Sequence, residues 1–184
     1  MSDVANRWRS IAGTFTQRVG AVPADAWANP SPCDGWAARD VVRHLVEWVP
    51  PFLDAGAGVI IDAGPAVDSD PAGAWAHLDD TIQAVLDDDG IDDRVFDHPY
   101  AGHHRLDEAI ERFVLGDVLI HTWDLSRATG QDERLDASMV ASMLDGLAAM
   151  GDVLQQSGQY GARIDVPDDA DNQTKLLALT GRRT

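Results

Sequence analysis

Two segments of the chain place polar side chains where the pattern of an amphipathic helix requires apolar ones. In residues 105–129, one helix face carries a stripe whose members recur every three or four positions. The stripe consists of Leu106, Ile110, Phe113, Asp117, His121, Asp124 and Ala128. Burying a neutral polar group without a partner costs roughly 2–7 kcal/mol, and burying a charge costs more. The fold must therefore supply partners for the polar half of this stripe.

A second stripe of the same kind lies in the helix predicted to begin near residue 36. It consists of Val41, His44, Leu45, Trp48 and Phe52. His44 therefore points toward the same core as Asp117 and His121, and a divalent ion between the three side chains would satisfy all of them. The i, i+4 spacing places Asp117 and His121 on one helix face, where they can chelate one ion. We therefore predict a metal site formed by His44, Asp117 and His121.

Simpler interpretations of the same residues remain open. His44 can be a core histidine bonded to a carbonyl, and Asp117 and His121 can form an ordinary hydrogen bond within one helix. As a metal site, two nitrogens and one oxygen suit Zn, Ni or Fe(II) and leave a position for water or a substrate. Asp124 and Arg127 can support the ligands or contact a substrate, although capping or a salt bridge is the simpler role for Arg127.

Apolar periodicity predicts an all-α protein. Pro50 and Pro51 are expected to kink or interrupt the second helix after Val49. A short extended stretch is expected at 94–96, and the segment 98–104 is turn-like. The helices are expected from a cap at Ser2 to near Gly20, from about residue 36 to Val49, from Pro71 to the acidic run at 87–89, and over 105–129, about 136–157, and 175–179.

Composition limits the classes of function. The 184 residues are enough for one domain over 1–184 with its own core, and few for two domains. The net charge of -17 at pH 7 disfavours nucleic acids and anionic membranes as partners. The single cysteine, Cys33, allows no intramolecular disulfide, and no targeting or membrane-spanning segment is expected. We therefore expect a cytoplasmic protein that has no nucleic-acid or membrane partner.

The remaining polar and aromatic residues carry weaker signals. Cys33 lies in a loop without a paired base, so it is interpreted as a packing residue. Arg182 and Arg183 are interpreted as a solvated tail. The tryptophans interpreted as core anchors are Trp36, Trp48 and Trp123. His77 is assigned to the surface. His98, His103 and His104 are assigned to a solvated loop, with the alternative that one of them closes over the site as an acid or base.

Four segments together resemble a known family. They are SPCDGW at 31–36, RDVVRH at 39–44, GDVLIHTWDLSRATG at 116–130 and VPDDADNQTKLLALTGR at 166–182. These segments are similar to the metal-binding proteins related to the N-terminal domain of mycothiol-dependent maleylpyruvate isomerase, a group within the DinB-like bundle superfamily. The similarity extends from the first helix to the C-terminal segment. The motifs are specific for the family and say little about the reaction.

The resemblance implies a DinB-like four-helix bundle with an additional C-terminal helix and short extended segments. It also implies a divalent metal, commonly zinc, held by a histidine of the second helix and a carboxylate-x-x-x-His of the fourth, which here are His44, Asp117 and His121. The isomerase has Glu at the position of Asp117, so the shorter carboxylate can contact the ion directly or through water. The further C-terminal domain of the isomerase is not expected here, so its substrate contacts are not carried over.

Two functions fit these residues. The first is a metal-dependent transferase or isomerase that uses a small-molecule thiol, with mycothiol as cosubstrate, and an electrophile. A bound ion with an open position lowers the pKa of a coordinated thiol and polarises an electrophile. The second is a non-catalytic metal-binding or interaction module in which the ion stabilises the bundle, and a homodimer through helix faces fits it. An accessible cavity beside the ligands favours the enzyme, whereas a saturated, buried ion favours the module.

Overall fold

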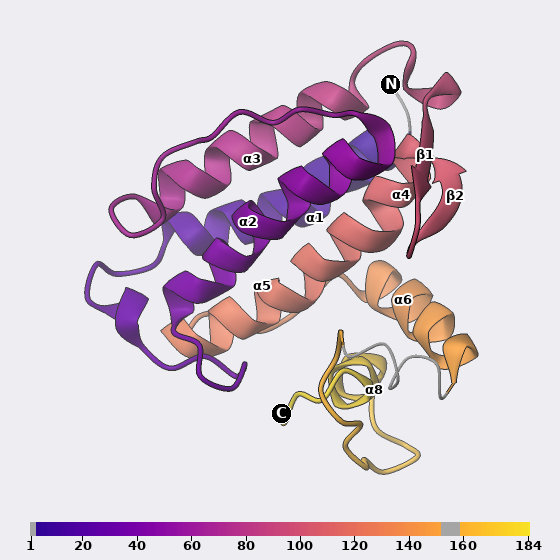
Figure 1. Cartoon of the computed structure of the whole chain (residues 1–184). Helices are drawn as coiled ribbons and strands as arrows, with labels where there is room; N and C mark the ends of the chain where they lie inside the picture. Colours follow the sequence, from indigo (N-terminus) through magenta and orange to yellow (C-terminus); the bar gives the residue numbers. More distant parts are fainter. Residues whose placement is uncertain (1–2, 152–158) are drawn as a thin grey trace.

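Four long helices lie side by side and form the body of the molecule (Figure 1). The computed structural model describes residues 3–151 and 159–184. The four helices are α1 (Asp3–Gly20), α2 (Ala38–Ala57), α3 (Pro71–Leu86) and α5 (Gly116–Thr129). Helix α1 contacts α3 and α5, and α2 contacts the same two helices, so the four close into a bundle. The predicted helical bundle is confirmed, and α2 lies next to α5.

The bundle closes around an apolar core that contains large aromatic side chains. Trp8 and Phe15 of α1 and Trp75 of α3 are buried, and the rings of Phe15 and Trp75 meet edge to face with centroids 4.6 Å apart. Trp8 donates to Asp79 at 2.8 Å, and Trp75 donates to the hydroxyl of Thr16 at 2.8 Å. The Thr16 hydroxyl in turn donates to Asp79 at 2.7 Å. Because its indole groups are paired, this core joins α1 to α3 without leaving an indole donor unsatisfied.

Helix α2 continues through Pro50 and Pro51, so of the two effects predicted for these prolines, a kink or an interruption, the interruption after Val49 does not occur. Each proline lacks an amide hydrogen and removes one bond of the helix ladder. Glu47 and Pro51 are exposed, so this side of the helix faces water, which can bond to carbonyls that lose an amide partner. The helix ends instead at Gly58, whose φ of 62° suits a residue without a Cβ atom.

The helix expected over residues 105–129 contains a π-helical segment. Its successive parts are α4 (Leu106–Ala109), the π segment η3 (Ile110–Leu115) and α5. A π turn holds more residues than an α turn, so it rotates the helix face that follows it relative to the face before it. Val114 and Leu115 are consequently buried, whereas Phe113 is only part buried. Phe113 still packs against the core, but from its edge, with its ring centroid 5.7 Å from that of Phe52.

An antiparallel hairpin precedes this helix. Its strands are β1 (Val95–His98) and β2 (Gly102–Arg105), and Val95 pairs with Arg105. The extended stretch predicted at 94–96 is confirmed, but the segment 98–104 is a turn only at 99–101. Phe96 is buried and its ring lies against Gly56 of α2. The hairpin is thereby fixed on the bundle.

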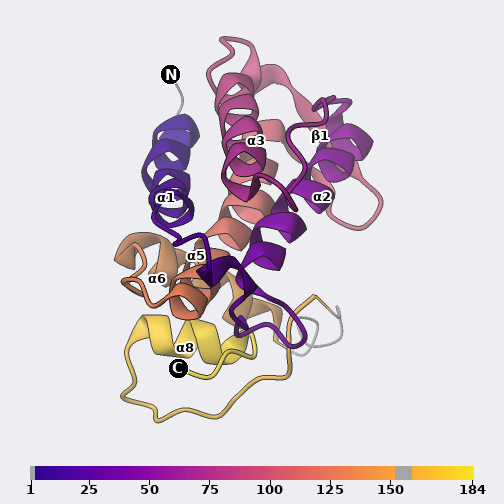
Figure 2. The ribbon, with the colours of Figure 1, turned by 90° about the vertical axis from the view of Figure 1, so that its left-hand side faces the viewer.

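The last helices, α6 (Ala137–Met150) and α8 (Asn172–Leu179), pack on each other beside one end of the bundle (Figures 1 and 2). The helix predicted over 136–157 is confirmed up to Met150, and residues 152–158 lie outside the described residues. Helix α8 begins earlier than predicted because the Asp171 side chain accepts from the Thr174 amide at 2.9 Å.

Two short 3-10 helices complete the described elements, η1 (Ala26–Ala28) and η2 (Ile91–Asp93). Among the helices of residues 3–151 and 159–184, none is long and apolar enough to cross a membrane.

The close approach of Phe96 to Gly56 gives a test of the packing. A Cβ atom at Gly56 would lie 2.0 Å from the Phe96 ring, which is fully buried, whereas a Cβ atom at Gly13 of α1 would meet no atom within 4 Å. We expect Gly56→Ala to lower the free energy of unfolding by about 1–3 kcal/mol through overpacking. We expect the control, Gly13→Ala, to raise it by roughly 0.5–1 kcal/mol through helix propensity. Urea unfolding measures both, and a stabilised Gly56→Ala protein would contradict this packing.

Candidate metal centre

The three predicted ligands lie together where α2 meets α5. His44 is on α2, and Asp117 and His121 are on successive turns of α5. The Nε2 atom of His44 lies 3.0 Å from Oδ2 of Asp117, and Nε2 of His121 lies 3.4 Å from Oδ1 of Asp117. The two imidazole centroids are 4.9 Å apart. One ligand atom from each residue lies within 4.8 Å of the other two, a separation that one divalent ion can bridge.

Two tryptophans border this cluster. Trp48, one turn after His44, donates its indole hydrogen to Oδ2 of Asp117 at 3.0 Å. Trp36, from the loop before α2, lies against both imidazoles, with centroid distances of 5.1 Å to His44 and 5.9 Å to His121. Both tryptophans are part buried and pack against the edge of the hydrophobic core, whereas Trp123 is fully buried, so all three contribute to packing as predicted.

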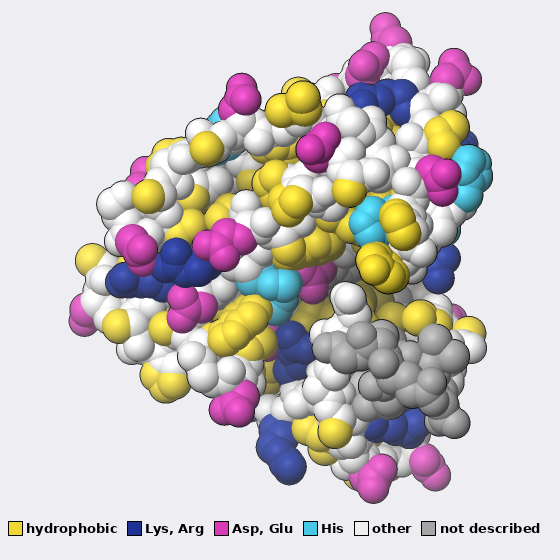
Figure 3. All heavy atoms as spheres, in the orientation of Figure 1, with side chains coloured by type: hydrophobic (Ala, Val, Ile, Leu, Met, Phe, Trp, Pro, Cys, Tyr) yellow, Lys and Arg dark blue, Asp and Glu magenta, His cyan; other side chains and the backbone are white. Residues whose placement is uncertain are grey.

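The cluster has a buried side and an open side. The exposed side-chain fraction is 31% for His44 and 22% for Asp117, but 4% for His121. Figure 3 shows histidine and acidic side chains together in a hollow between the bundle and the C-terminal part of the chain. An ion held here would therefore have one side open to water or to a small molecule.

A second set of polar residues lies behind His121. Asp124 is fully buried, and its Oδ2 atom lies 2.9 Å from Nδ1 of His121. Cys33 donates to the same oxygen at 3.4 Å, and Arg182 donates to it at 2.9 Å. The predicted contact of Asp124 with a ligand is present in the structure. The interpretations of Cys33 as packing and of Arg182 as a solvated tail are wrong.

Cys33, His121 and Asp124 also have the residue types of a metal site, but the positive charge of the neighbouring Arg182 disfavours a cation there. Ligand atoms of these three residues lie within 4.8 Å of one another. However, the guanidinium of Arg182 already pairs with Asp124 and lies 3.6 Å from the Cys33 sulfur. A second cation at that place would be repelled by Arg182. The cluster of His44, Asp117 and His121 is therefore the better candidate for holding an ion.

The other residues singled out in the sequence lie apart from the cluster. Arg127 pairs with Glu133 at 3.0 Å and stacks on Trp123, which is the salt-bridge role expected for it. His77 is part exposed and bonded to a backbone carbonyl. Three further histidines lie on the hairpin strands and not in the expected loop: His98, His103 and His104. Among the described residues, none of these four histidines belongs to a group that could hold a metal ion.

Charge and burial act in opposite directions on the cluster. Burial disfavours the charged form of His121, but the charge of Asp117 and hydrogen bonds with Asp124 and Cys33 outweigh it and raise the pKa of His121 to about 10. Burial also opposes ionisation of Asp117, yet the charge of His121 and the contact with His44 lower the pKa of this carboxyl. Burial and the negative charge of Asp117 raise the pKa of Tyr160 to about 12, so a neutral hydroxyl lies near the cluster.

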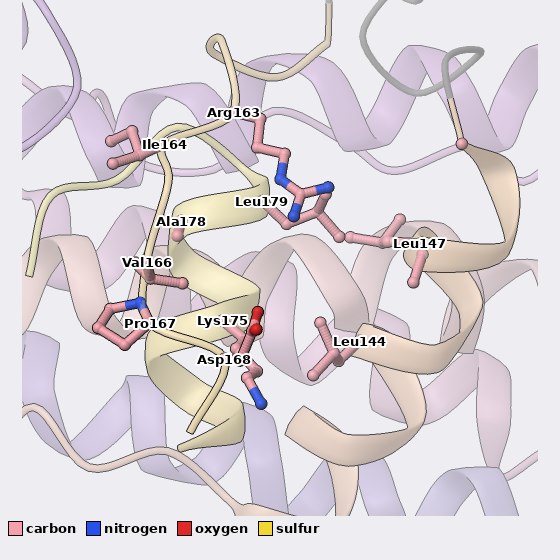
Figure 4. A pocket seen from close by; sticks show the side chains of 12 residues that line it. Leu144, Leu147, Arg163, Ile164, Val166, Pro167, Asp168, Lys175, Ala178 and Leu179 are labelled. Atoms are coloured by element: carbon pink, nitrogen blue, oxygen red, sulfur yellow. The ribbon is translucent and has the colours of Figure 1, made fainter. Parts of the chain in front are cut away.

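Two hollows lie close to these elements, and none of the three candidate ligands lines either of them. An open hollow of about 530 Å³ is lined by the loop between Ala28 and Ala37, including Cys33 and Trp36. Trp36, which lines this hollow, packs on both imidazoles and therefore lies between the hollow and the cluster. A mostly apolar pocket of about 290 Å³ lies between α6 and α8 (Figure 4), and none of the cluster residues lines it.

The raised pKa of His121 gives a test of this electrostatic arrangement. Its folded-state pKa lies above the ordinary value of 6.5, so its contribution to stability is present below about pH 6.5 and is lost as the pH rises through about 10. We expect the free energy of unfolding of the chelator-treated protein to fall over this range. The variant His121→Gln should lose most of that fall. Denaturant unfolding at a series of pH values measures it, and an undiminished fall in the variant would contradict the assignment.

Comparison with known proteins connects this geometry to a family. Residues 8–126, which include all three candidate ligands, match the family described as the mycothiol maleylpyruvate isomerase N-terminal domain. Two uncharacterized proteins, from two strains of Mycobacterium tuberculosis, are each 26% identical to this chain over 148 residues, which cover 74% of this chain and 72% of theirs. No solved structure matches. The chain therefore belongs to the mycothiol maleylpyruvate isomerase N-terminal domain family, whose members have a DinB-like fold.

Proposed function

We propose that this protein binds one divalent ion, for which zinc fits the donor set, and acts as a transferase or isomerase that uses a small-molecule thiol of the mycothiol type. The ligands would be His44, Asp117 and His121. One observation carries the proposal: ligand atoms from two helices converge, and two of the three side chains are part exposed. Three protein ligands with an open side are typical of reactive rather than structural metal sites.

The chain's own residues would hold the ligands in place. Trp48 donates to Asp117 at 3.0 Å, which fixes the orientation of the carboxylate. Asp124 accepts from Nδ1 of His121 at 2.9 Å, which leaves Nε2 directed to the cluster. Trp36 packs on both imidazoles and restricts their rotation. These contacts favour a preformed site.

The ion would supply the chemistry, since a divalent cation lowers the pKa of a coordinated thiol and polarises an electrophile. In the reaction we propose, the S–H bond of the thiol breaks and its proton passes to solvent. The sulfur then forms a bond to an electrophilic carbon, and the electron pair displaced from that carbon takes up a proton. The part-exposed side of His44 and Asp117 would admit both reactants.

Metal binding itself is the first test of the proposal. We expect about one zinc ion per chain in the zinc-loaded protein, and we expect His44→Ala and His121→Ala each to lose most of it, because two remaining ligands rarely hold a labile ion. His77→Ala is the matched control, since His77 lies apart from the cluster. Elemental analysis after dialysis measures occupancy. Full occupancy in both cluster variants would contradict the ligand assignment.

Activity is the second test. We expect the zinc-loaded protein to accelerate conjugation of mycothiol to soft electrophiles, with a rate that falls at low pH as the thiolate is lost. Asp117→Asn should lower the rate even where metal is retained, because it removes a negative charge beside the ion. Asp117→Glu should retain metal, but moving the ion by about 1 Å can cost ~10²-fold in rate.

The apo protein and the His77→Ala variant serve as controls for this assay. A rate equal to that of the apo protein across a panel of thiols and electrophiles would reject the enzyme. Metal retention without any such rate would favour the alternative, a non-catalytic module in which the ion stabilises the bundle.

A further inference from the structure

Arg182 lies against Asp124 with most of its side chain covered. Its Nη2 atom donates to Oδ2 of Asp124 at 2.9 Å, and its Nε atom donates to Oδ1 at 3.3 Å, so the guanidinium faces both carboxylate oxygens. Its Nη1 atom donates to the backbone carbonyl of Thr180 at 3.0 Å. The Arg182 side chain is 11% exposed and Asp124 is fully buried. A two-point contact of this kind fixes the orientation of the carboxylate as well as its position.

Asp124 in turn faces the nitrogen of His121 that points away from Asp117. Its Oδ2 atom is 2.9 Å from Nδ1, whereas Nε2 of the same ring is 3.4 Å from Asp117. An ionised carboxylate only accepts hydrogen bonds, so Nδ1 carries the hydrogen of this contact. A neutral histidine with its hydrogen on Nδ1 has its lone pair on Nε2, which is the atom that a cation in the cluster requires.

We infer that Arg182 is a positioning residue for the candidate metal centre: by orienting Asp124, it fixes His121 with Nε2 directed to the ion. The inference rests on the metal binding proposed above and extends it to the C-terminal segment. Arg182 lies outside residues 8–126, the part of the chain that matches the family. The affinity of the centre for its ion therefore depends on a residue from another part of the chain.

Other contacts hold the C-terminal segment in place, so Arg182 can be changed without removing the segment. Leu176 and Leu177 of α8 are fully buried. The Gln173 side chain donates to the backbone carbonyl of Glu133 and accepts from the backbone amide of Leu135, both at 2.9 Å. A variant at Arg182 is therefore expected to keep α8 on the molecule.

The turn before Arg182 directs this side chain toward the bundle. Gly181 has a φ of 85°, and a Cβ atom there would lie 2.7 Å from the backbone of Gly161. Only glycine fits this combination of backbone conformation and close approach without strain. The neighbouring Arg183 is exposed, so it has the same charge in the same segment without the contact. Arg183 therefore provides a matched control.

The test measures zinc affinity of the full chain by competition with a chromophoric chelator. We expect Arg182→Gln to weaken zinc binding by about 10–100-fold, the usual effect of removing a residue that orients a metal ligand. Arg182→Lys keeps the positive charge but lacks the planar guanidinium that contacts both oxygens of Asp124, so we expect an intermediate loss of zinc affinity. Arg183→Gln should bind zinc as the wild type does. Circular dichroism and urea unfolding of the metal-free variants report whether each one folds.

A folded Arg182→Gln protein with wild-type zinc affinity would overturn the inference. If the wild type and Arg183→Gln both fail to bind zinc, the proposed metal binding fails, and the inference about Arg182 fails with it. If both bind zinc and only the effect of Arg182→Gln is missing, the inference fails while the proposed metal binding stands. If Arg182→Gln does not fold, Arg182→Lys decides: wild-type affinity in that folded variant would overturn the inference.

A double-mutant cycle separates positioning through Asp124 from a general structural role. If Arg182 acts through Asp124, adding Arg182→Gln to Asp124→Asn should weaken zinc binding little further, because both changes remove the same interaction. Additive losses of zinc affinity in the folded double variant would overturn the inference.

Discussion

A buried imidazole between two carboxylates is the interaction on which the rest of this arrangement depends. His121 faces Asp117 through Nε2 at 3.4 Å and Asp124 through Nδ1 at 2.9 Å, and 4% of its side chain is exposed. Buried polar groups of this kind require partners. Asp117 contacts His44 of α2, and Asp124 contacts Arg182 near the C-terminus. Two elements far apart in the sequence therefore meet at one side chain of α5.

The helix that carries His121 is irregular just before the cluster. A π-helical segment ends at Leu115, two residues before Asp117, and such segments are frequent at functional sites because they rotate the helix face that follows. Helix α2 presents His44 and Trp48 on adjacent turns, and both contact the same oxygen of Asp117 at 3.0 Å. The carboxylate is thus oriented from α2, while His121 is oriented from the C-terminal segment.

Sequence periodicity could predict the helices and the His44, Asp117 and His121 cluster, because spacings of three and four residues define a helix face. It could not predict the surroundings of His121. Cys33 and Arg182 lie 91 and 58 residues from Asp124 along the chain, in a loop and a terminal segment without periodicity. Only tertiary packing brings these two residues to the carboxylate. The helix through Pro50 was missed for another reason: local propensity does not register which side of a helix faces water.

X-ray absorption spectroscopy of the zinc-loaded protein tests the central claim most directly. If His44, Asp117 and His121 hold the ion, its first shell contains two imidazole nitrogens and at least one oxygen at about 2.0–2.2 Å, and no sulfur. The same shell should be seen in Cys33→Ser. A sulfur at about 2.3 Å, lost in Cys33→Ser, would place the ion between Cys33, His121 and Asp124 instead and would contradict the account.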